Sequence, residues 1–151
     1  ILGYVIGAVV RGILIGVGVL AIAVFFGAAH FSSFWLFLFY ITSISVVFGL
    51  VGVLVGLWAN NFEQLAALNT FVIMPLSFVG GVFNSIHMLP GKWQIIAQMN
   101  PFFYFVDGVR YSMIGISEGN MAIGVAMIAG LIGFLSYVVW RLFEIGWHLP
   151  A

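Results

Sequence analysis

The sequence predicts an all-α membrane protein with four transmembrane helices, and three observations support this fold class. Hydrophobic residues make up 64% of the 151 residues, charged residues make up 5%, and the mean hydropathy is +1.26. Soluble domains carry about 25% charged residues, and a chain this apolar would aggregate in water. Its apolar residues also gather in long runs, and a helix that spans a bilayer needs about 20 of them. Lipid is therefore the expected solvent of this chain.

Four apolar runs are long enough to span a bilayer: about 12–29, 34–57, 65–84 and 120–140. The third contains Pro75, which lacks a backbone donor and clashes with the preceding helical turn, so we expect a kink there. Residues 1–10 extend the first run as far as Arg11. They form either a short helix at the membrane interface or the start of one long tilted helix, with Arg11 reaching towards the interface. Because residue 1 is Ile and no signal peptide is recognisable, we expect an N-terminal part to be missing.

Glycines four residues apart predict close contacts between spans, because the absent side chains let two helices approach each other. The pairs are Gly3 and Gly7, Gly12 and Gly16, and Gly52 and Gly56. In a chain with 19 glycines such spacings also arise by chance, so ordinary small residues are the alternative interpretation.

Residues 86–117 join the third and fourth spans and are longer and more polar than the other connections. Their aromatic residues are interleaved with charged ones, which is typical of the membrane interface. An amphipathic pattern predicts a first short helix. Asn100 can cap a second one, with Pro101 at its first position. On that helix Asp107 and Arg110 are three residues apart, so we expect them to pair.

The expected pair of Asp107 and Arg110 has two interpretations. It is either an ordinary interfacial ion pair that steadies a loop, or the contact that fixes the packing of two short helices. In the second case these helices would dip back towards the membrane and form the outer gate of a transport pathway. The pattern alone leaves both open.

The chain offers no set of residues suited to catalysis or to binding a cofactor. Its three histidines are scattered and cysteine is absent, which argues against a metal site. It has no glycine-rich loop that ends in Lys-Ser or Lys-Thr, so any ATP would bind to another subunit. Basic residues do not cluster and the net charge is zero, so we expect no nucleic-acid partner.

Charge does not orient the spans across the membrane. Four spans would place both chain ends on one side, together with Glu63 in the loop after the second span. Arg11 and Arg141 would lie on that side, and Lys92 and Arg110 on the other. The positive-inside rule therefore gives a tie.

An ordered set of residues resembles the signature of ABC-2 type permeases, the membrane subunits of a class of ATP-binding-cassette exporters. The set comprises Pro75, Phe78, Gly80, Gly81, Phe83, Leu89, Pro90, Trp93, Asn100, Pro101, Tyr104, Val106, Asp107 and Arg110. It is most similar to the bacterial branch that includes nodulation-factor and antibiotic exporters. Gly80 and Asn84 stand where many members have Ser and Pro, and these two departures leave the substrate branch open.

The resemblance implies a bacterial inner-membrane permease of six spans, of which this chain holds the last four. Both chain ends and the Glu63 loop would be cytoplasmic, and residues 86–117 would form an external re-entrant hairpin. Arg11 and Glu63 would belong to the coupling region that receives force from a separate ATP-binding subunit, and a second copy of the permease would complete the complex. The residues of the substrate pathway or gate would be Pro75, Phe78, Gly80, Gly81, Phe83, Asn100, Pro101, Tyr104, Asp107 and Arg110.

The expected function is that of a permease subunit in an ATP-driven exporter, with ATP bound to the partner and no cofactor in this chain. Because no predicted span carries a charge at its middle, we expect a lipid-like, glycan-lipid or amphipathic substrate rather than an ion. The alternative is a secondary transporter or channel-like protein without an ATPase, which the broken helix at Pro75 favours. It lacks the mid-membrane ionisable residue expected of such transporters.

Overall fold

The computed structural model describes residues 2–28, 32–81 and 85–146, which form helices and turns without strands. The α-helices are α1 (Leu2–Phe25), α2 (Phe34–Trp58), α3 (Phe62–Leu68), α4 (Met74–Val79), α5 (Gly91–Met99), α6 (Pro101–Ile114) and α7 (Met121–Ile145). A π-helical segment, η1 (Asn69–Ile73), joins α3 to α4, and a short 3₁₀ helix, η2 (Ile86–Met88), precedes α5. The predicted all-α class is confirmed.

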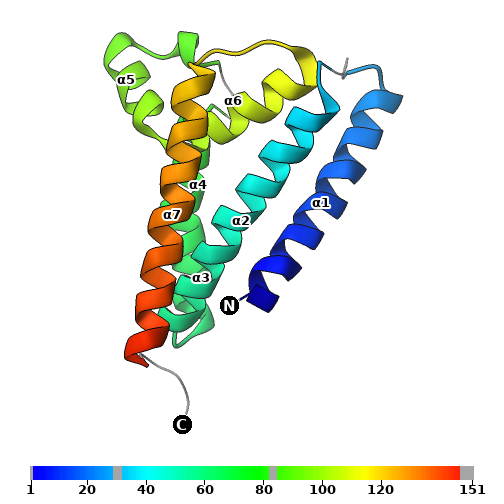
Figure 1. Cartoon of the computed structure of the whole chain (residues 1–151). Coiled ribbons are helices and arrows are strands. Elements are labelled where there is room, and N and C mark those ends of the chain that lie inside the picture. The colour runs from blue at the N-terminus through cyan, green and yellow to red at the C-terminus, as the bar shows by residue number, and fades with distance from the viewer. Residues whose placement is uncertain (1, 29–31, 82–84, 147–151) are drawn as a thin grey trace.

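Four helical stretches are long and apolar enough to cross a membrane: Leu2–Phe25, Phe34–Trp58, Phe62–Val79 and Met121–Ile145. They run between the two ends of the molecule, whereas α5 and α6 lie across one end (Figure 1). We call η2, α5 and α6 together the hairpin, and the end that they cover the hairpin end. The four predicted membrane helices are therefore present.

Polar caps and glycines set the ends of the long helices. The Ser33 Oγ accepts a hydrogen bond from the N–H of Leu36 at 3.4 Å, and the Asn120 Oδ1 accepts one from the N–H of Ala122 at 2.9 Å. These side chains accept hydrogen bonds from backbone N–H groups that have no partner within the first turn of the helix. Gly146 ends α7 at a φ of +70°, a conformation that glycine adopts at little cost.

The first span is one continuous helix that begins at Leu2 rather than near residue 12. Apolar residues on both sides of Arg11 keep this helix unbroken. The separate interfacial helix considered for residues 1–10 is therefore wrong for the described part of the chain, and the single long helix is confirmed.

Glycine lets α1 and α2 pack closely at one of the three predicted pairs. Gly12 lies directly against Ser45, and a Cβ added to Gly16 would lie 3.2 Å from the Cγ2 of Ile41. The predicted helix contact is confirmed at this pair. Nothing lies within 4 Å of the Cβ positions of the other two pairs, so those glycines face open space among the described residues.

The third span changes its hydrogen-bonding pattern just ahead of Pro75. It runs through α3, η1 and α4, and the N–H of Met74 donates to the carbonyl of Asn69, five residues earlier. Pro75 has no N–H to continue the α-helical pattern, and a π-helical turn is one of the recognised ways in which a helix absorbs such a defect. The predicted distortion is confirmed, as a π-helical segment. The span ends where Gly81 turns the chain at a φ of +84°.

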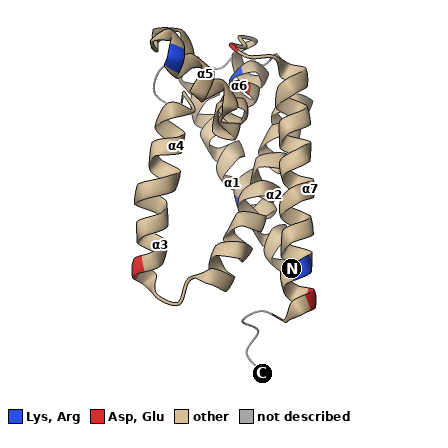
Figure 2. Cartoon of the chain, turned by 90° about the vertical axis from the view of Figure 1, so that its left-hand side faces the viewer, with Lys and Arg blue, Asp and Glu red and all other residues tan. Residues whose placement is uncertain are grey.

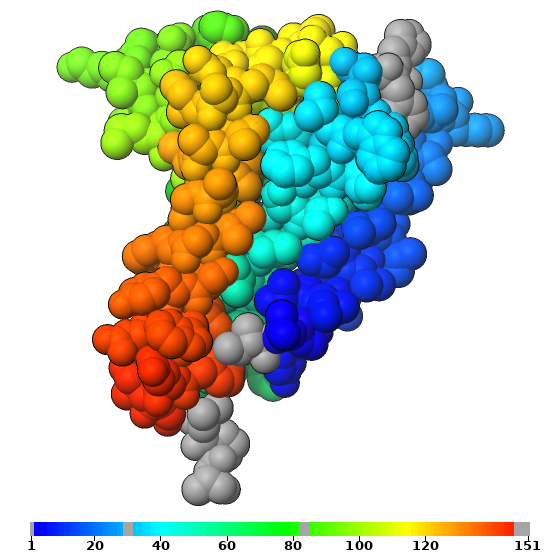
Figure 3. Space-filling model, viewed as in Figure 1, coloured from blue at the N-terminus to red at the C-terminus, as the bar shows by residue number. Residues whose placement is uncertain are grey.

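The best-packed part of the molecule is where α6 meets α2 and α7. One cluster of buried residues consists of Tyr40, Val47, Phe105 and Ile128, and a second consists of Ile86, Ala97, Phe103 and Tyr104. Figure 3 shows α1, α2 and α7 side by side with α2 in the middle. By contrast, the span Phe62–Val79 contains no buried residue and stands apart from the other spans along most of its length (Figure 2). The hairpin is thus anchored on α2 and α7, while the third span is held mainly where α4 contacts α6.

Candidate functional site

Three segments meet at the hairpin end and place most of the predicted gate residues together. They are the end of α4 with Gly81, the hairpin itself, and the loop of residues 115–120 that leads into α7. Gly115 ends α6 at a φ of +75°, so the loop turns back over the helix that it has just left. Two carboxylates, Asp107 and Glu118, accept most of the hydrogen bonds that join these segments.

Arg110 forms an ion pair with Glu118, which lies in the loop. The Arg110 Nη1 is 2.9 Å from the Glu118 Oε1, and its Nη2 donates to the carbonyl of Gly81 at 3.1 Å. The Oγ of Ser85 donates to Glu118 Oε1 at 2.8 Å, and the N–H of Ile86 donates to Oε2 at 2.9 Å. The exposed fractions of the two charged side chains are 25% for Arg110 and 13% for Glu118, so the pair is partly desolvated. This pair connects α6, the end of α4, η2 and the loop.

Asp107 is buried and holds the loop through three hydrogen bonds. Only 3% of the residue is exposed. Its Oδ2 accepts from the Oγ of Ser117 at 2.7 Å and from the N–H of Gly119 at 3.1 Å, and its Oδ1 accepts from the N–H of Glu118 at 2.7 Å. The predicted ion pair between Asp107 and Arg110 is therefore wrong in its partners. The two residues are helical neighbours, but the folded-back loop offers each of them a different partner.

The surroundings of Glu118 lower the pKa of its carboxyl below the ordinary value. Partial burial alone would raise the pKa, but the hydrogen bonds from Ile86 and Ser85 and the positive charge of Arg110, with His87 nearby, outweigh it. Glu118 is thus held in its charged form. The network needs that charge, because a protonated carboxyl would be a poorer acceptor for its three donors, Ser85, Ile86 and Arg110.

Gly80 and Asn100 fix where α6 crosses the end of the third span. A Cβ added to Gly80 would lie 2.7 Å from the Cβ of Phe102, so only glycine allows this approach. The Nδ2 of Asn100 donates to the carbonyl of Leu76 in α4 at 2.7 Å, while its Oδ1 caps α6 by accepting from the N–H of Phe102 at 3.0 Å. Pro101 occupies the first turn of α6 as predicted.

The remaining predicted pathway residues have different surroundings. Tyr104 is buried, and its Cδ1 lies 3.0 Å from the position of a Cβ on Gly124 in α7. Phe78 is 53% exposed on α4. Pro75 lies in the first turn of α4 after the π-helical segment. Phe83 falls outside the described residues.

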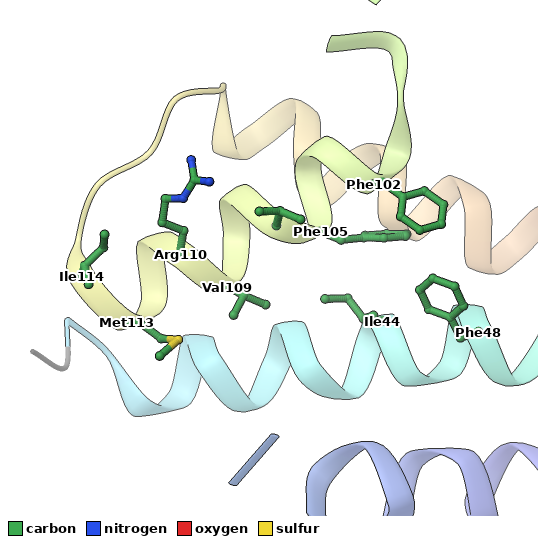
Figure 4. Close-up of a pocket in the computed structure, with 9 residues that line it drawn as sticks. Ile44, Phe48, Phe102, Phe105, Val109, Arg110, Met113 and Ile114 are labelled. Atoms are coloured by element: carbon green, nitrogen blue, oxygen red, sulfur yellow. The ribbon is translucent and has the colours of Figure 1, made fainter. Parts of the chain in front are cut away.

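An apolar pocket of about 530 Å³ lies between α6 and α2 (Figure 4). It is lined by Ile44, Phe48, Phe102, Phe105, Val106, Val109, Arg110, Met113 and Ile114. The rings of Phe48 and Phe102 are in edge-to-face contact with centroids 5.5 Å apart, and those of Phe48 and Phe105 are 6.1 Å apart. The guanidinium of Arg110 turns away from the apolar floor, where Ile44 and Phe48 project from α2 (Figure 4). The hairpin therefore roofs an apolar space with an aromatic cluster.

The described residues contain no group of three His, Asp or Glu side chains that could hold a metal ion. Their carboxylates are instead engaged in the hydrogen bonds of the hairpin end or exposed at the opposite end.

Arg11 lies within the first span rather than at its border. Its neighbour Gly12 packs against Ser45, which stands about halfway along α2. Ser45 is about 17 Å from Phe34 at a helical rise of about 1.5 Å per residue, so Arg11 lies level with the middle of the second candidate span. The prediction that no span carries a charge at its middle is therefore wrong, because it rested on a span that began at residue 12. A charged side chain at this depth costs about 2.5–3.5 kcal/mol on insertion scales and usually marks a functional site.

Glu118 is the important residue that the sequence interpretation missed. Asp107 and Arg110 are close in sequence and on one helical face, so they were paired with each other. The loop of residues 115–120 was read only as a link to the next span, and no partner was sought in it. The signal that could have found Glu118 is the sequence Gly115-Ile116-Ser117-Glu118-Gly119, in which two glycines flank a short polar segment. Such a segment favours a turn directly after α6 and hence contact with that helix.

Residues 1–114 match the family model described as ABC-2 type transporter. The chain is 35% identical over 147 residues to a protein named inner membrane transport permease YadH from Escherichia coli K12, which covers 97% of this chain and 57% of that protein. It is 29% identical over 134 residues to nodulation protein J from Rhizobium leguminosarum biovar viciae, covering 85% of this chain and 50% of that protein. The chain thus spans about half the length of the curated relatives that it matches. No solved structure matches the chain.

Proposed function

Because the chain belongs to the ABC-2 type transporter family, we propose that it forms the C-terminal four spans of a six-span permease subunit in an ATP-driven exporter. The observation that carries the proposal is the hairpin, which roofs an apolar pocket and is tied down by two carboxylates. The permease supplies the route for the substrate. ATP is hydrolysed on a separate ATP-binding subunit, since the chain has no phosphate-binding loop.

The chain spans the bacterial inner membrane with its hairpin on the outer side. The name of the Escherichia coli relative, an inner membrane transport permease, supports this location. The hairpin combines exposed aromatic and apolar residues with charges, a mixture that suits the membrane interface. Glu63, exposed at the opposite end, then faces the cytoplasm and can contact the ATP-binding subunit. Arg11 lies too deep in the first span for that contact, so we assign coupling to the Glu63 loop alone.

Transport requires the spans to alternate between two arrangements that expose the route to opposite sides of the membrane. In the arrangement of the structure the hairpin closes one end, because Phe102 and Phe105 contact Phe48 of α2. The polar network around Arg110 and Asp107 holds the hairpin in that position. Nucleotide binding on the partner subunit would shift the spans and break part of this contact.

The lining of the pocket supports an amphipathic or lipid-like substrate. Aliphatic and aromatic side chains make up all of its lining except Arg110 at the edge. An acyl chain or another apolar group can be accommodated there without leaving a polar group unpaired. A cation would find no ligand on these walls.

A second copy of the permease is the other proposed partner. The span Phe62–Val79 has no buried residue and exposes Phe71, Val72 and Met74. Membrane helices associate through close packing rather than through the hydrophobic effect. A homodimer, together with the rest of the longer subunit, would give this span the packing that it lacks.

Co-expression with the ATP-binding subunit tests the proposal. The full-length gene product should co-purify with the ATPase encoded beside it, and reconstituted complexes should hydrolyse ATP only when that ATPase is intact. The permease alone should be inactive. Hydrolysis by the purified permease, or substrate export that persists with an inactive ATPase, would contradict the proposal and favour a transporter driven without ATP.

A further inference from the structure

A long groove runs along α1 and α2 and contains Arg11 in its wall. It has a volume of about 950 Å³ and is lined by Gly3, Tyr4, Gly7, Ala8, Arg11, Gly12, Ile15, Ile44, Ser45, Phe48, Gly49, Gly52, Val53, Gly56, Leu57 and Phe143. Ile44 and Phe48 also line the pocket beneath the hairpin. The groove and that pocket are therefore neighbours that share two side chains, and Arg11 lies in the wall of the groove.

Arg11 carries a permanent positive charge that no acidic residue of the described chain neutralises. The described residues form two ion pairs, Arg110 with Glu118 and Arg141 with Glu144, and Arg11 belongs to neither. A guanidinium in this apolar groove calls for an anion, because the low dielectric strengthens the attraction and leaves an unpaired charge costly. The charge of the groove thus specifies the charge of its occupant.

The acidic residues of these 151 residues cannot supply the anion at that depth, whether from this copy or from a second one. The sequence has four acidic residues, and all of them lie at the ends of the spans. Asp107 and Glu118 belong to the hairpin end, Glu63 to the loop after α2, and Glu144 to the last turn of α7. None stands level with the middle of α1.

We propose that the groove binds an anionic amphiphile from the bilayer, with its phosphate or carboxylate head group on Arg11 and its apolar part along the glycine-rich wall. The absence of side chains at Gly7, Gly52 and Gly56 leaves the space that an alkyl chain needs. This inference rests on the proposed function, because it names the class of substrate that the route would carry. It narrows that class from amphipathic molecules in general to those with a negative charge.

The test uses the full-length gene product in phosphatidylcholine nanodiscs, with a single cysteine as a reporter in this cysteine-free sequence. A fluorophore on Val53→Cys reports on the groove, and one on Ile22→Cys, which is exposed on α1 outside the groove, serves as the control position. The quenchers are phosphatidic acid and phosphatidylcholine that carry the same nitroxide on the acyl chain. At Val53→Cys, phosphatidic acid should half-quench the fluorophore at a mole fraction about tenfold lower than phosphatidylcholine needs. That ratio corresponds to a binding preference of about 1.4 kcal/mol for phosphatidic acid. At Ile22→Cys the two lipids should quench equally.

Variants of Arg11 test whether its positive charge causes the preference for phosphatidic acid over phosphatidylcholine. Arg11→Gln should abolish the preference at Val53→Cys, and Arg11→Lys should keep most of it. Arg141→Gln, which removes an exposed arginine at the end of α7, should leave it unchanged. Equal quenching by both lipids at Val53→Cys, or a preference that survives Arg11→Gln, would overturn the proposal. Absence of quenching by either lipid would also overturn it, because the groove would then be filled by another part of the protein.

This experiment needs no ATP, so its failure can be distinguished from failure of the proposed function. A charge-selective groove in a protein that shows no ATPase-dependent export would refute only the exporter assignment. ATP-driven export by a protein without that selectivity would refute only the anion site.

Discussion

Arg110 of α6 and Glu118 of the following loop form the contact that closes the hairpin end, with 2.9 Å between Nη1 and Oε1. Both side chains have further partners on other segments, Gly81 for the arginine and Ser85 and Ile86 for the glutamate. One partly desolvated ion pair thus joins two parts of the chain, residues 81–86 and residues 110–118.

We expect the coupling energy between Arg110 and Glu118 to be about 1–3 kcal/mol, because hydrogen bonds to charged groups are worth that much when they are shielded from water. A double-mutant cycle with Arg110→Gln and Glu118→Gln, followed by unfolding in micelles, measures it. The pair of Arg141 and Glu144 provides a matched control, since both side chains are about half exposed. Its coupling should stay below about 0.5 kcal/mol. Equal couplings in the two cycles would show that the hairpin pair has no structural role.

Asp107→Ala should destabilise the protein more than Asp107→Asn does. The alanine leaves the partly buried N–H groups of Glu118 and Gly119 without their acceptor, at up to about 1–3 kcal/mol for each, whereas asparagine keeps one oxygen. In a cycle with Arg110→Gln, Asp107 should show little coupling, because the two residues have separate partners. Strong coupling there would restore the ion pair predicted from helical spacing.

Acid should weaken the hairpin end through Glu118. Its pKa is lower in the folded protein than the ordinary value of about 4.5. The stability that this shift contributes is therefore fully present above the ordinary value and is lost as the pH falls through the lowered one. Hydrogen exchange of the hairpin amides should accelerate in that range, and Glu118→Gln should remove this part of the pH dependence. Parallel pH profiles for the parent and the variant would rule out Glu118 as the titrating group.

Gly80→Ala should impair transport and lower stability, because the new methyl would lie 2.7 Å from the Cβ of Phe102 and 3.1 Å from its carbonyl carbon. The backbone must then move, and the contact between α4 and α6 opens. Gly133→Ala in α7 is the control, since nothing lies within 4 Å of its Cβ position. That variant should fold at least as well as the parent, given the higher helix propensity of alanine. An assay of ATP-driven export and a thermal melt would report both effects.

Cysteine labelling should reveal the orientation of the spans. An impermeant maleimide added to spheroplasts should modify Gln98→Cys in α5 and should leave Asn61→Cys unmodified until the membrane is opened. Both positions are exposed, so accessibility of the side chain is not limiting. The opposite labelling pattern would place the hairpin in the cytoplasm.

The sequence was sufficient to predict the membrane spans and the start of α6, because both depend on local rules. Length and apolarity define a span, and Asn100 followed by Pro101 defines a helix start regardless of what surrounds it. The distortion at Pro75 was predictable for the same reason, since the missing N–H belongs to the residue itself.

The ion pair was not predictable from helical spacing, because its partner comes from a loop. Asp107 and Arg110 satisfy the rule for neighbours on a helix, yet the tertiary fold offers Arg110 a carboxylate eight residues later in the chain. The depth of Arg11 was also missed. The predicted first span was started just after Arg11, so this residue was placed at the end of the span by definition. Its position along the membrane normal becomes clear only from the packing of Gly12 against Ser45, which sets the height of α1 relative to α2.

The third span packs against the rest of the described molecule mainly at one end, so it could tilt about that end. It contacts the rest of the described molecule mainly through α4 and α6, and its 18 residues extend about 27 Å from that point at about 1.5 Å per residue. A tilt of about 10° would therefore displace the Glu63 end by about 5 Å and the Gly80 end hardly at all. A force applied at Glu63 would therefore move that end of the span and leave the Gly80 end almost in place. Under the proposed function, a tilt of this span alone would leave the Gly80 end almost in place, so opening the hairpin end would also require the contacts of Arg110 with Gly81 and Glu118 to rearrange.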